Sequence, residues 1–185
     1  MAWILNENYR RRSSAEKPEW IVVHYPAMPG ANAARVRNYF YDEKHKTSSH
    51  FCVDDDEVLK VLDVKYAAYH VGGKKTSLNG CYNGNAIGID LCDDKVNRRS
   101  IRAEDGDWFI HAETMRNAAR LIARLMRQYD IPIERIVRHY DVTHKRCPRP
   151  LVGNDPSANY PGMTCDELWE NFKKKCLSEY RKFGK

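Results

Sequence analysis

Two short apolar runs, each carrying a polar residue near its end, set the fold that this chain can adopt. The first is "EWIVVHYPA" at residues 19–27, where a β-branched run reaches His24 and is closed by Pro26. The second is "AIGIDLC" at 86–92, which carries Asp90. Continuous apolar runs of this length, rich in β-branched residues, are typical of buried strands. We therefore expect both runs to lie inside a sheet that helices cover.

The remaining segments alternate between helical and strand patterns. In chain order they predict a helix at 30–43, a hairpin at 49–63, a helix at 107–130, a strand at 135–139 and a C-terminal helix at about 165–182. The last helix should begin after a capping box formed by Thr164 and Glu167. Strands interleaved with helices predict an α/β fold with a mixed central β-sheet flanked by helices.

The length of 185 residues suits one domain with a hydrophobic core, so we expect a single domain spanning 1–185. The start, "MAWILNENYRRRSS", has its basic cluster after the short apolar stretch, opposite to the order in a signal peptide. We therefore expect cytoplasmic synthesis without a signal peptide, and six cysteines without disulfides.

The charge and hydropathy patterns narrow the expected partners. No apolar run approaches the ~20 residues that span a membrane, so we expect no membrane insertion. The net charge is +6, but the basic residues are scattered, and each cluster is interpreted as solvated surface. No nucleic-acid-binding motif is present, so nucleic acid is not expected as a partner. The overall positive charge favours an anionic partner, and we expect a monomer.

Candidate metal ligands lie at strand ends and in the segment "RHYDVTHKRCPRP" at 138–150. His24 ends the first buried strand, His139 ends the last predicted strand, and Cys147 follows in a proline-stiffened loop. Polar groups at strand ends are where α/β proteins place their chemistry. Two histidines and one thiolate are sufficient protein ligands for a catalytic zinc, whereas a structural zinc would need a fourth, such as His144.

Two simpler interpretations compete with a metal site. A lone histidine at a strand end is commonly a hydrogen-bonded structural residue, and a lone cysteine is commonly a small buried apolar side chain. The ligand spacing does not decide between these interpretations, because no short motif joins the three residues.

Five sequence blocks, in order, carry a resemblance to a known family. They are "IVVHYPA", "SSHFCVDDDEVLKVLD", "AYHVGG", "NAIGID" and "RHYDVTHKRCP". Together they resemble the zinc-dependent N-acetylmuramoyl-L-alanine amidases, a fold shared with amidase-type phage lysozymes and peptidoglycan recognition proteins. The likeness covers about residues 19–150, the expected core of the catalytic domain, and is greatest to phage and prophage endolysins and to autolysins of spore-forming bacteria.

The resemblance implies roles for individual residues. His24, His139 and Cys147 would be the zinc ligands, and Lys145 matches a lysine that the family places beside the scissile carbonyl. Asp90 lies where the endolysin branch usually has a catalytic glutamate.

Another branch of the family uses a tyrosine where this chain has Ser49, which leaves Asp90 as the expected base. Aspartate is one methylene shorter than glutamate, so its backbone must approach more closely or a water must bridge. An alternative role for Asp90 is to orient a metal-bound histidine.

The resemblance also implies the reaction: hydrolysis of the amide between N-acetylmuramic acid and L-alanine of peptidoglycan, acting on the bacterial cell wall after release, as a phage or prophage endolysin does. His70 is a candidate substrate contact, and Asn85 is a candidate for holding the groove loop and binding substrate. The other histidines are expected to be structural or exposed bystanders: His45, His50, His111 and His144.

Three rival functions remain open. Non-catalytic peptidoglycan-binding relatives typically lack the cysteine ligand, which is present here as Cys147. A cytoplasmic amidase acting on soluble muropeptides would also lack a signal peptide. A zinc-stabilised structural domain would bind metal without catalysis.

Overall fold

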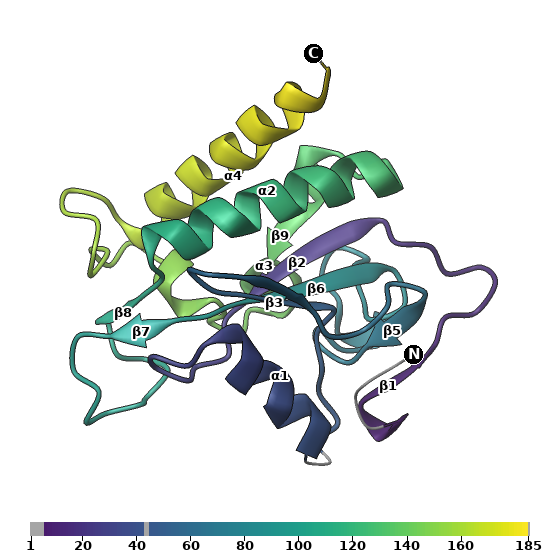
Figure 1. Cartoon of the computed structure of the whole chain (residues 1–185), viewed down its shortest axis with the longest axis horizontal. Helices are drawn as coiled ribbons and strands as arrows, with labels where there is room; N and C mark the ends of the chain where they lie inside the picture. The colour runs from purple at the N-terminus through teal and green to yellow at the C-terminus, as the bar shows by residue number, and fades with distance from the viewer. Residues whose placement is uncertain (1–5, 43–44, 185) are drawn as a thin grey trace.

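A five-stranded mixed sheet lies at the centre of the computed structural model, which describes residues 6–42 and 45–184 (Figure 1). The strands are β2 (Trp20–His24), β3 (Phe51–Val53), β4 (Val58–Lys60), β6 (Ala86–Leu91) and β9 (Ile136–Arg138). Their order is β4-β3-β6-β2-β9. Strand β2 pairs parallel with β6 and β9, β3 pairs parallel with β6, and β3 pairs antiparallel with β4. The expected mixed sheet is confirmed.

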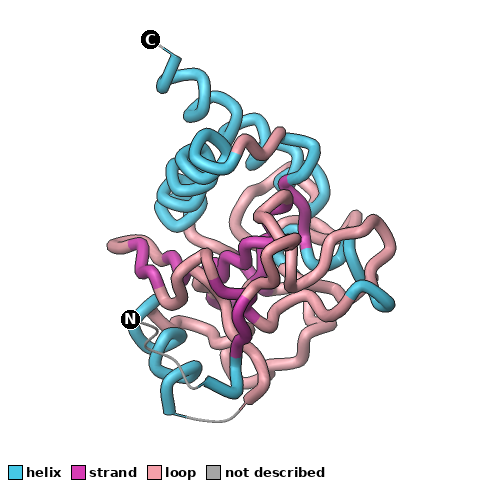
Figure 2. The backbone as a smooth tube through the Cα atoms, turned by 90° about the vertical axis from the view of Figure 1, so that its right-hand side faces the viewer, coloured by secondary structure: helices cyan, strands magenta, loops and turns pink. Residues whose placement is uncertain are grey.

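Helices cover both faces of this sheet. Helices α2 (Ala112–Tyr129) and α4 (Cys165–Arg181) lie together on one face, and α1 (Ala33–Asp42) lies on the other (Figure 1). The side view in Figure 2 shows the two long helices on one side of the strands and mostly loops on the other. None of the helices within 6–42 and 45–184 is long and apolar enough to cross a membrane.

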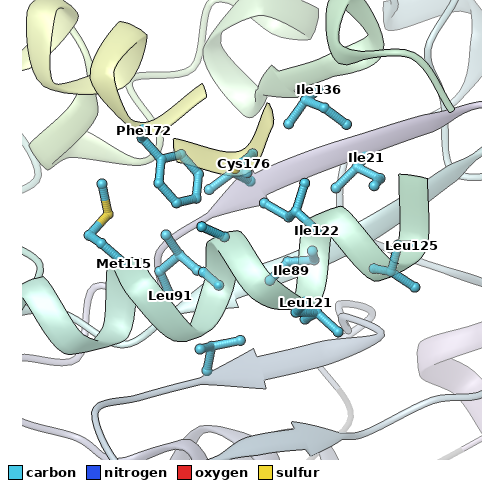
Figure 3. Close-up of a cluster of buried hydrophobic side chains, with 14 of the residues drawn as sticks. Ile21, Ile89, Leu91, Met115, Leu121, Ile122, Leu125, Ile136, Phe172 and Cys176 are labelled. Carbon is cyan, nitrogen blue, oxygen red and sulfur yellow. The ribbon is translucent and has the colours of Figure 1, made fainter. Parts of the chain in front are cut away.

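Side-chain alternation along the strands divides the molecule into a core side and a functional side. The larger core joins the strands to α2 and α4 through these residues: Ile21, Val23, Ile87, Ile89, Leu91, Ile122, Leu125 and Phe172 (Figure 3). Because neighbouring residues of a strand point to opposite faces, His24 and Asp90 point away from α2 and α4. They therefore lie on the face that carries α1.

The acidic turn of the hairpin holds a helix on each face. The Asp54 carboxylate accepts a hydrogen bond from the Ala33 amide at 2.7 Å, at the start of α1. The Asp55 carboxylate accepts one from the Thr114 amide at 3.0 Å, in the first turn of α2. These contacts satisfy amides that a helix leaves free at its N-terminus, so the turn fixes α1 and α2 relative to the sheet.

The second helix begins later than its sequence pattern predicts. It starts at Ala112 instead of residue 107, because β8 (Trp108–Phe109) pairs antiparallel with β7 (Asp94–Lys95). The buried Lys95 ammonium forms ion pairs with Asp105 and Asp107, which draws the preceding loop toward β7. A contact between distant segments thus outweighs the local helical pattern.

Other predicted boundaries differ only slightly. The first helix begins at Ala33, and residue 43, its expected end, lies outside the described residues. Strand β9 ends at Arg138, so His139 is the first residue of a short helix, α3 (His139–Thr143), which was not predicted. The Thr164 capping box is confirmed, with the Glu167 amide donating to the Thr164 hydroxyl at 3.2 Å. Among the described residues there are also five 3-10 turns: Asn6–Asn8, Lys74–Thr76, Ile133–Arg135, Arg149–Leu151 and Lys182–Gly184.

The segment before residue 19 belongs to the fold, although it precedes the predicted core. Strand β1 (Tyr9–Arg11) pairs antiparallel with β5 (Tyr66–Ala68). The Arg12 guanidinium donates to the Val64 and Ala86 carbonyls, each at 2.8 Å. Its burial lowers the Arg12 pKa to about 10. The interpretation of this basic cluster as solvated surface is therefore wrong for Arg12, which fixes the N-terminal segment to β6.

Candidate metal centre and active site

Three potential ligands meet where parallel strands end. His24 is the last residue of β2, His139 follows β9 directly, and Cys147 lies in the loop after α3. Strands β2 and β9 are parallel neighbours, so their carboxyl ends lie at the same edge of the sheet. One donor atom from each residue lies within 4.8 Å of the others, and all three residues are buried. The structure thus brings together residues that are far apart in sequence.

The ring orientations show which nitrogens face the centre of this group. The Nδ1 atom of His24 lies 3.7 Å from the Cys147 sulfur. The Nδ1 atom of His139 is buried and has no hydrogen-bond partner in the described part of the chain. Buried polar atoms in folded proteins almost always have a partner. An orphaned imidazole nitrogen beside a second imidazole and a thiol therefore fits a group that can hold a metal ion.

Burial sets the protonation states of the three groups. Burial, aided by the neighbouring His139 and His70 imidazoles, holds the His24 pKa well below its usual range. Burial, aided by the positive charge of Lys145, lowers the His139 pKa to about 4. Both imidazoles are therefore neutral near pH 7 and keep a nitrogen lone pair. Burial raises the Cys147 pKa to about 12. A coordinating cation would offset this burial effect, because metal coordination deprotonates a thiol.

A cavity of about 400 Å³ opens beside the three candidate ligands. His70, Asp90 and Lys145 line it together with these three residues. The β2–α1 loop and α1 line it as well, with these apolar residues: Tyr25, Pro26, Met28, Val36, Tyr39 and Phe40. A cavity with an apolar wall and a few convergent polar groups is the usual form of a binding site.

Asp90 is placed beside the ligand group by strand register. It is the direct partner of His24 in the parallel β2–β6 pair. Burial raises the Asp90 pKa to about 6, while the Ser49 hydroxyl and the positive charge of Lys145 oppose this rise. The carboxyl group is therefore poised to gain or lose a proton near neutral pH.

Comparison with known proteins agrees with this geometry. The family model described as N-acetylmuramoyl-L-alanine amidase matches residues 14–150. The chain belongs to this amidase family. Among curated relatives, a probable N-acetylmuramoyl-L-alanine amidase from Bacillus licheniformis is 39% identical over 144 residues, covering 71% of this chain and 36% of the relative. The amidase CwlL from the same species is 36% identical over 142 residues, covering 72% and 37%. The chain thus spans little more than a third of these relatives.

Solved structures support the same family fold. The catalytic domain of XlyA matches with a TM-score of 0.65 and 26% identity, covering 94% of this chain and 95% of that one. A mutant endolysin from Bacillus subtilis matches with a TM-score of 0.65 and 28% identity, covering 95% and 96%. Each match covers a larger share of this chain than the family model, which spans residues 14–150.

Asn85 is the one predicted site residue that this amidase fold keeps apart from the ligand group. It precedes β6, at the opposite end of the strand from Asp90. Its side-chain oxygen accepts from the Tyr82 amide at 2.9 Å, and its amide nitrogen donates to the Gly80 carbonyl at 3.1 Å. It lines a separate hollow and not the cavity beside the ligands. The expected loop-holding contacts are present, but the direct substrate contact is not supported.

The remaining histidines lie outside the ligand group. His50 is fully buried, and its ring nitrogens contact the Gly88 amide at 2.9 Å and the Tyr66 carbonyl at 3.1 Å. It is therefore structural, as predicted. The other three are at least partly exposed and include none of the converging donor atoms: His45, His111 and His144.

Two arginines that flank the segment from His139 to Cys147 were not predicted from the sequence to have a structural role. The Arg138 amide donates to the Asp141 carboxylate at 2.8 Å, which caps α3 and fixes His139 at its first turn. The Arg138 guanidinium also bonds the Leu151 carbonyl at 2.7 Å. Arg149 is buried and donates to Asp155 at 2.7 Å. An acidic residue three positions after Arg138 was the available signal for the cap.

Proposed function

We propose that this chain hydrolyses the amide between the lactyl group of N-acetylmuramic acid and L-alanine of peptidoglycan, using zinc held by His24, His139 and Cys147. The observation that carries the proposal is the convergence of these three donors beside an open cavity that Asp90 and Lys145 also line. Two imidazoles and one thiolate suit zinc and leave a fourth position open, as catalytic zinc sites require.

When bound, zinc supplies Lewis-acid polarisation of the amide carbonyl and lowers the pKa of a water molecule. Asp90 takes a proton from the attacking water and delivers it to the leaving amine nitrogen. Its pKa of about 6 suits both steps, because a general base works best when its pKa lies near the working pH. Strand register makes Asp90 the direct partner of His24, so its carboxyl group lies at the same end of the sheet as the proposed metal ligands.

Lys145 stabilises the negative charge that develops on the carbonyl oxygen. It is exposed at the mouth of the cavity, two residues before Cys147. Its charge already acts on the interior, because it lowers the pKa values of His139 and Asp90. A positive group in this place would favour a transition state with an oxyanion.

The substrate is the peptidoglycan of a bacterial cell wall, reached after release as a phage or prophage endolysin would reach it. The apolar wall of the cavity, formed by α1 and its preceding loop, would contact the lactyl and alanyl groups. The net charge of +6 would favour an anionic wall over a neutral one. We expect the chain to act as a monomer, without nucleic acid and without membrane insertion.

Mass spectrometry of digested peptidoglycan tests this proposal. Intact sacculi from several bacteria and soluble muropeptides are incubated with the zinc-loaded chain and, as a control, with Cys147→Ala. We expect peptides with a free L-alanine amino terminus together with intact glycan strands. Cleavage of soluble fragments alone would favour a recycling amidase. Binding without any new amino terminus would favour a non-catalytic binding module and contradict the proposal.

A further inference from the structure

We propose that His70 is a positioning residue for the metal ligand His24, accepting a hydrogen bond from its outer ring nitrogen and so keeping the inner nitrogen free for the metal. The inference rests on the proposed metal-dependent function. It gives His70 a role different from the direct substrate contact suggested by its place in the cavity.

The two ring nitrogens of His24 face different partners. Its Nε2 atom lies 2.9 Å from the Nδ1 atom of His70, and the two rings meet edge to face with an angle of 88°. Its Nδ1 atom lies on the other side, 3.7 Å from the Cys147 sulfur. His70 therefore contacts the nitrogen that points away from the ligand group.

This contact selects one of two tautomers. A neutral imidazole carries one N–H, so one nitrogen donates and the other accepts. If His70 donated across the 2.9 Å contact, the single N–H of His24 would lie on Nδ1 and block coordination there. If His24 donates, its Nδ1 atom keeps the lone pair. Metal-bound histidines almost always donate their second N–H to an outer partner, usually a carboxylate or carbonyl; here the partner is an imidazole.

The backbone of His70 is held by one side chain. The Asn83 side-chain oxygen accepts hydrogen bonds from three consecutive amides, those of His70 at 3.0 Å, Val71 at 2.8 Å and Gly72 at 3.1 Å. In return, the Asn83 amide donates to the Gly72 carbonyl at 2.9 Å. The loop that carries His70 is therefore anchored at the residue itself.

The ring of His70 is held by a glycine in the central sheet. It packs on β6 at Gly88, where an added Cβ would lie 2.8 Å from Cγ and 2.9 Å from Nδ1 of His70. A glycine inside a strand often marks a place where another group must approach closely. Gly88 faces the same side as His24 and Asp90, so its missing side chain provides the space for this ring.

Zinc affinity in a matched pair of variants tests the inference. At position 70, Asn keeps an acceptor oxygen close to the position of the His70 Nδ1 atom. Leu is similar in shape to Asn but has no hydrogen-bond acceptor. The zinc dissociation constant of each variant is measured by competition with a chromophoric chelator. We expect His70→Leu to bind zinc about 10- to 100-fold more weakly than wild type, and His70→Asn to stay within a few-fold.

Gly88→Ala and nuclear magnetic resonance supply independent readouts. Gly88→Ala leaves His70 in the chain but displaces its ring, so it should weaken zinc binding as His70→Leu does. In ¹⁵N spectra of the zinc-loaded wild type, His24 should carry its proton on Nε2 and exchange it slowly. That exchange should become faster in His70→Leu and Gly88→Ala. These signals depend on the hydrogen bond and would not follow from a purely structural role.

The outcomes separate this inference from the proposed function. Wild-type zinc affinity and slow His24 exchange in folded His70→Leu would overturn the positioning role alone. A raised KM with unchanged zinc affinity would do the same and assign His70 to the substrate. If His70→Leu fails to fold, equal zinc affinity in Gly88→Ala and wild type would still overturn it. Failure of the wild type itself to bind zinc would overturn the metal-dependent function, and this inference with it.

Discussion

The two ends of strand β6 use polar residues in opposite ways. At the amino end, Asn85 uses both atoms of its side-chain amide, toward Tyr82 and Gly80. The Arg12 guanidinium reaches across to the Ala86 carbonyl there. Polar groups at this end find their partners within the chain, so they stabilise the fold and need no further ligand.

At the carboxyl end of β6, some buried polar groups lack a hydrogen-bond or charge partner within the described part of the chain. The Nδ1 atom of His139 is buried without a hydrogen-bond partner among the described residues. Burial raises the Asp90 pKa to about 6 and the Cys147 pKa to about 12. Such groups are costly to bury unless a ligand completes them. The comparison teaches that polarity alone does not mark the site; what marks it is the convergence of buried donor atoms, one of them without a partner.

Among substitutions at the carboxyl end of β6 and around it, removal of a proposed metal ligand should reduce activity the most. Cys147→Ala should lower amidase activity by roughly 10³-fold or more, because the metal is expected to supply several kcal/mol of transition-state stabilisation. Turnover and bound zinc are measured together, with Cys165→Ala as the control, since Cys165 is also buried but lies at the start of α4. Equal loss in both variants would show that the effect is structural.

Replacement of Asp90, the proposed base, should give the next largest effect on turnover. Asp90→Asn preserves shape but cannot accept the proton, so kcat should fall by about 10²- to 10⁴-fold. Bound zinc, measured by metal analysis, should stay near one per chain. Asp56→Asn, at an exposed position, is the matched control. Near-normal turnover in Asp90→Asn would remove Asp90 from the chemistry and support a purely orienting role.

Lowering the pH should reduce the proposed amidase activity gradually, through protonation of Asp90 at the carboxyl end of β6. Asp90 must be unprotonated to act as the proposed base, and burial raises its pKa to about 6, so kcat/KM should fall as pH drops through about 6. Activity at pH 5 should be about tenfold below its plateau. Lys145 lowers the Asp90 pKa, so Lys145→Met should move the midpoint to higher pH. A midpoint that Lys145→Met leaves unchanged would contradict the proposed electrostatics.

A substitution at the amino end of strand β6 should lower the stability of the fold and leave activity unchanged. Asn85→Ala removes two hydrogen bonds and should lower the free energy of unfolding by about 1–2 kcal/mol, measured by urea denaturation. At a temperature where the variant is folded, kcat and KM should match wild type. Asn79→Ala, at an exposed position on the same loop, is the control. A raised KM in Asn85→Ala would restore its predicted contact with substrate.

Much of the fold followed from local patterns in the sequence. The strands at 20–24 and 86–91 lie within the predicted apolar runs, and the Thr164 capping box opens the last helix as predicted. These features depend on residues close in sequence. The start of helix α2 did not follow, because the Lys95 ion pairs recruit the residues before it into β8. The capping role of Arg138 was missed although Asp141 lies only three positions later. The burial of Arg149 was missed because a basic cluster does not reveal which of its arginines become buried.

The sequence by itself determined the type of sheet, the residues that end its buried strands and, through resemblance, the set of candidate ligands. Only the tertiary structure decided that His24 and Asp90 are partners in register, that Asn85 lies at the other end of the same strand, and that His24 turns one nitrogen toward Cys147. The physical reason is that strand patterns depend on near neighbours along the chain. Strand order, register and ring orientation depend instead on contacts between segments that meet only when the chain folds.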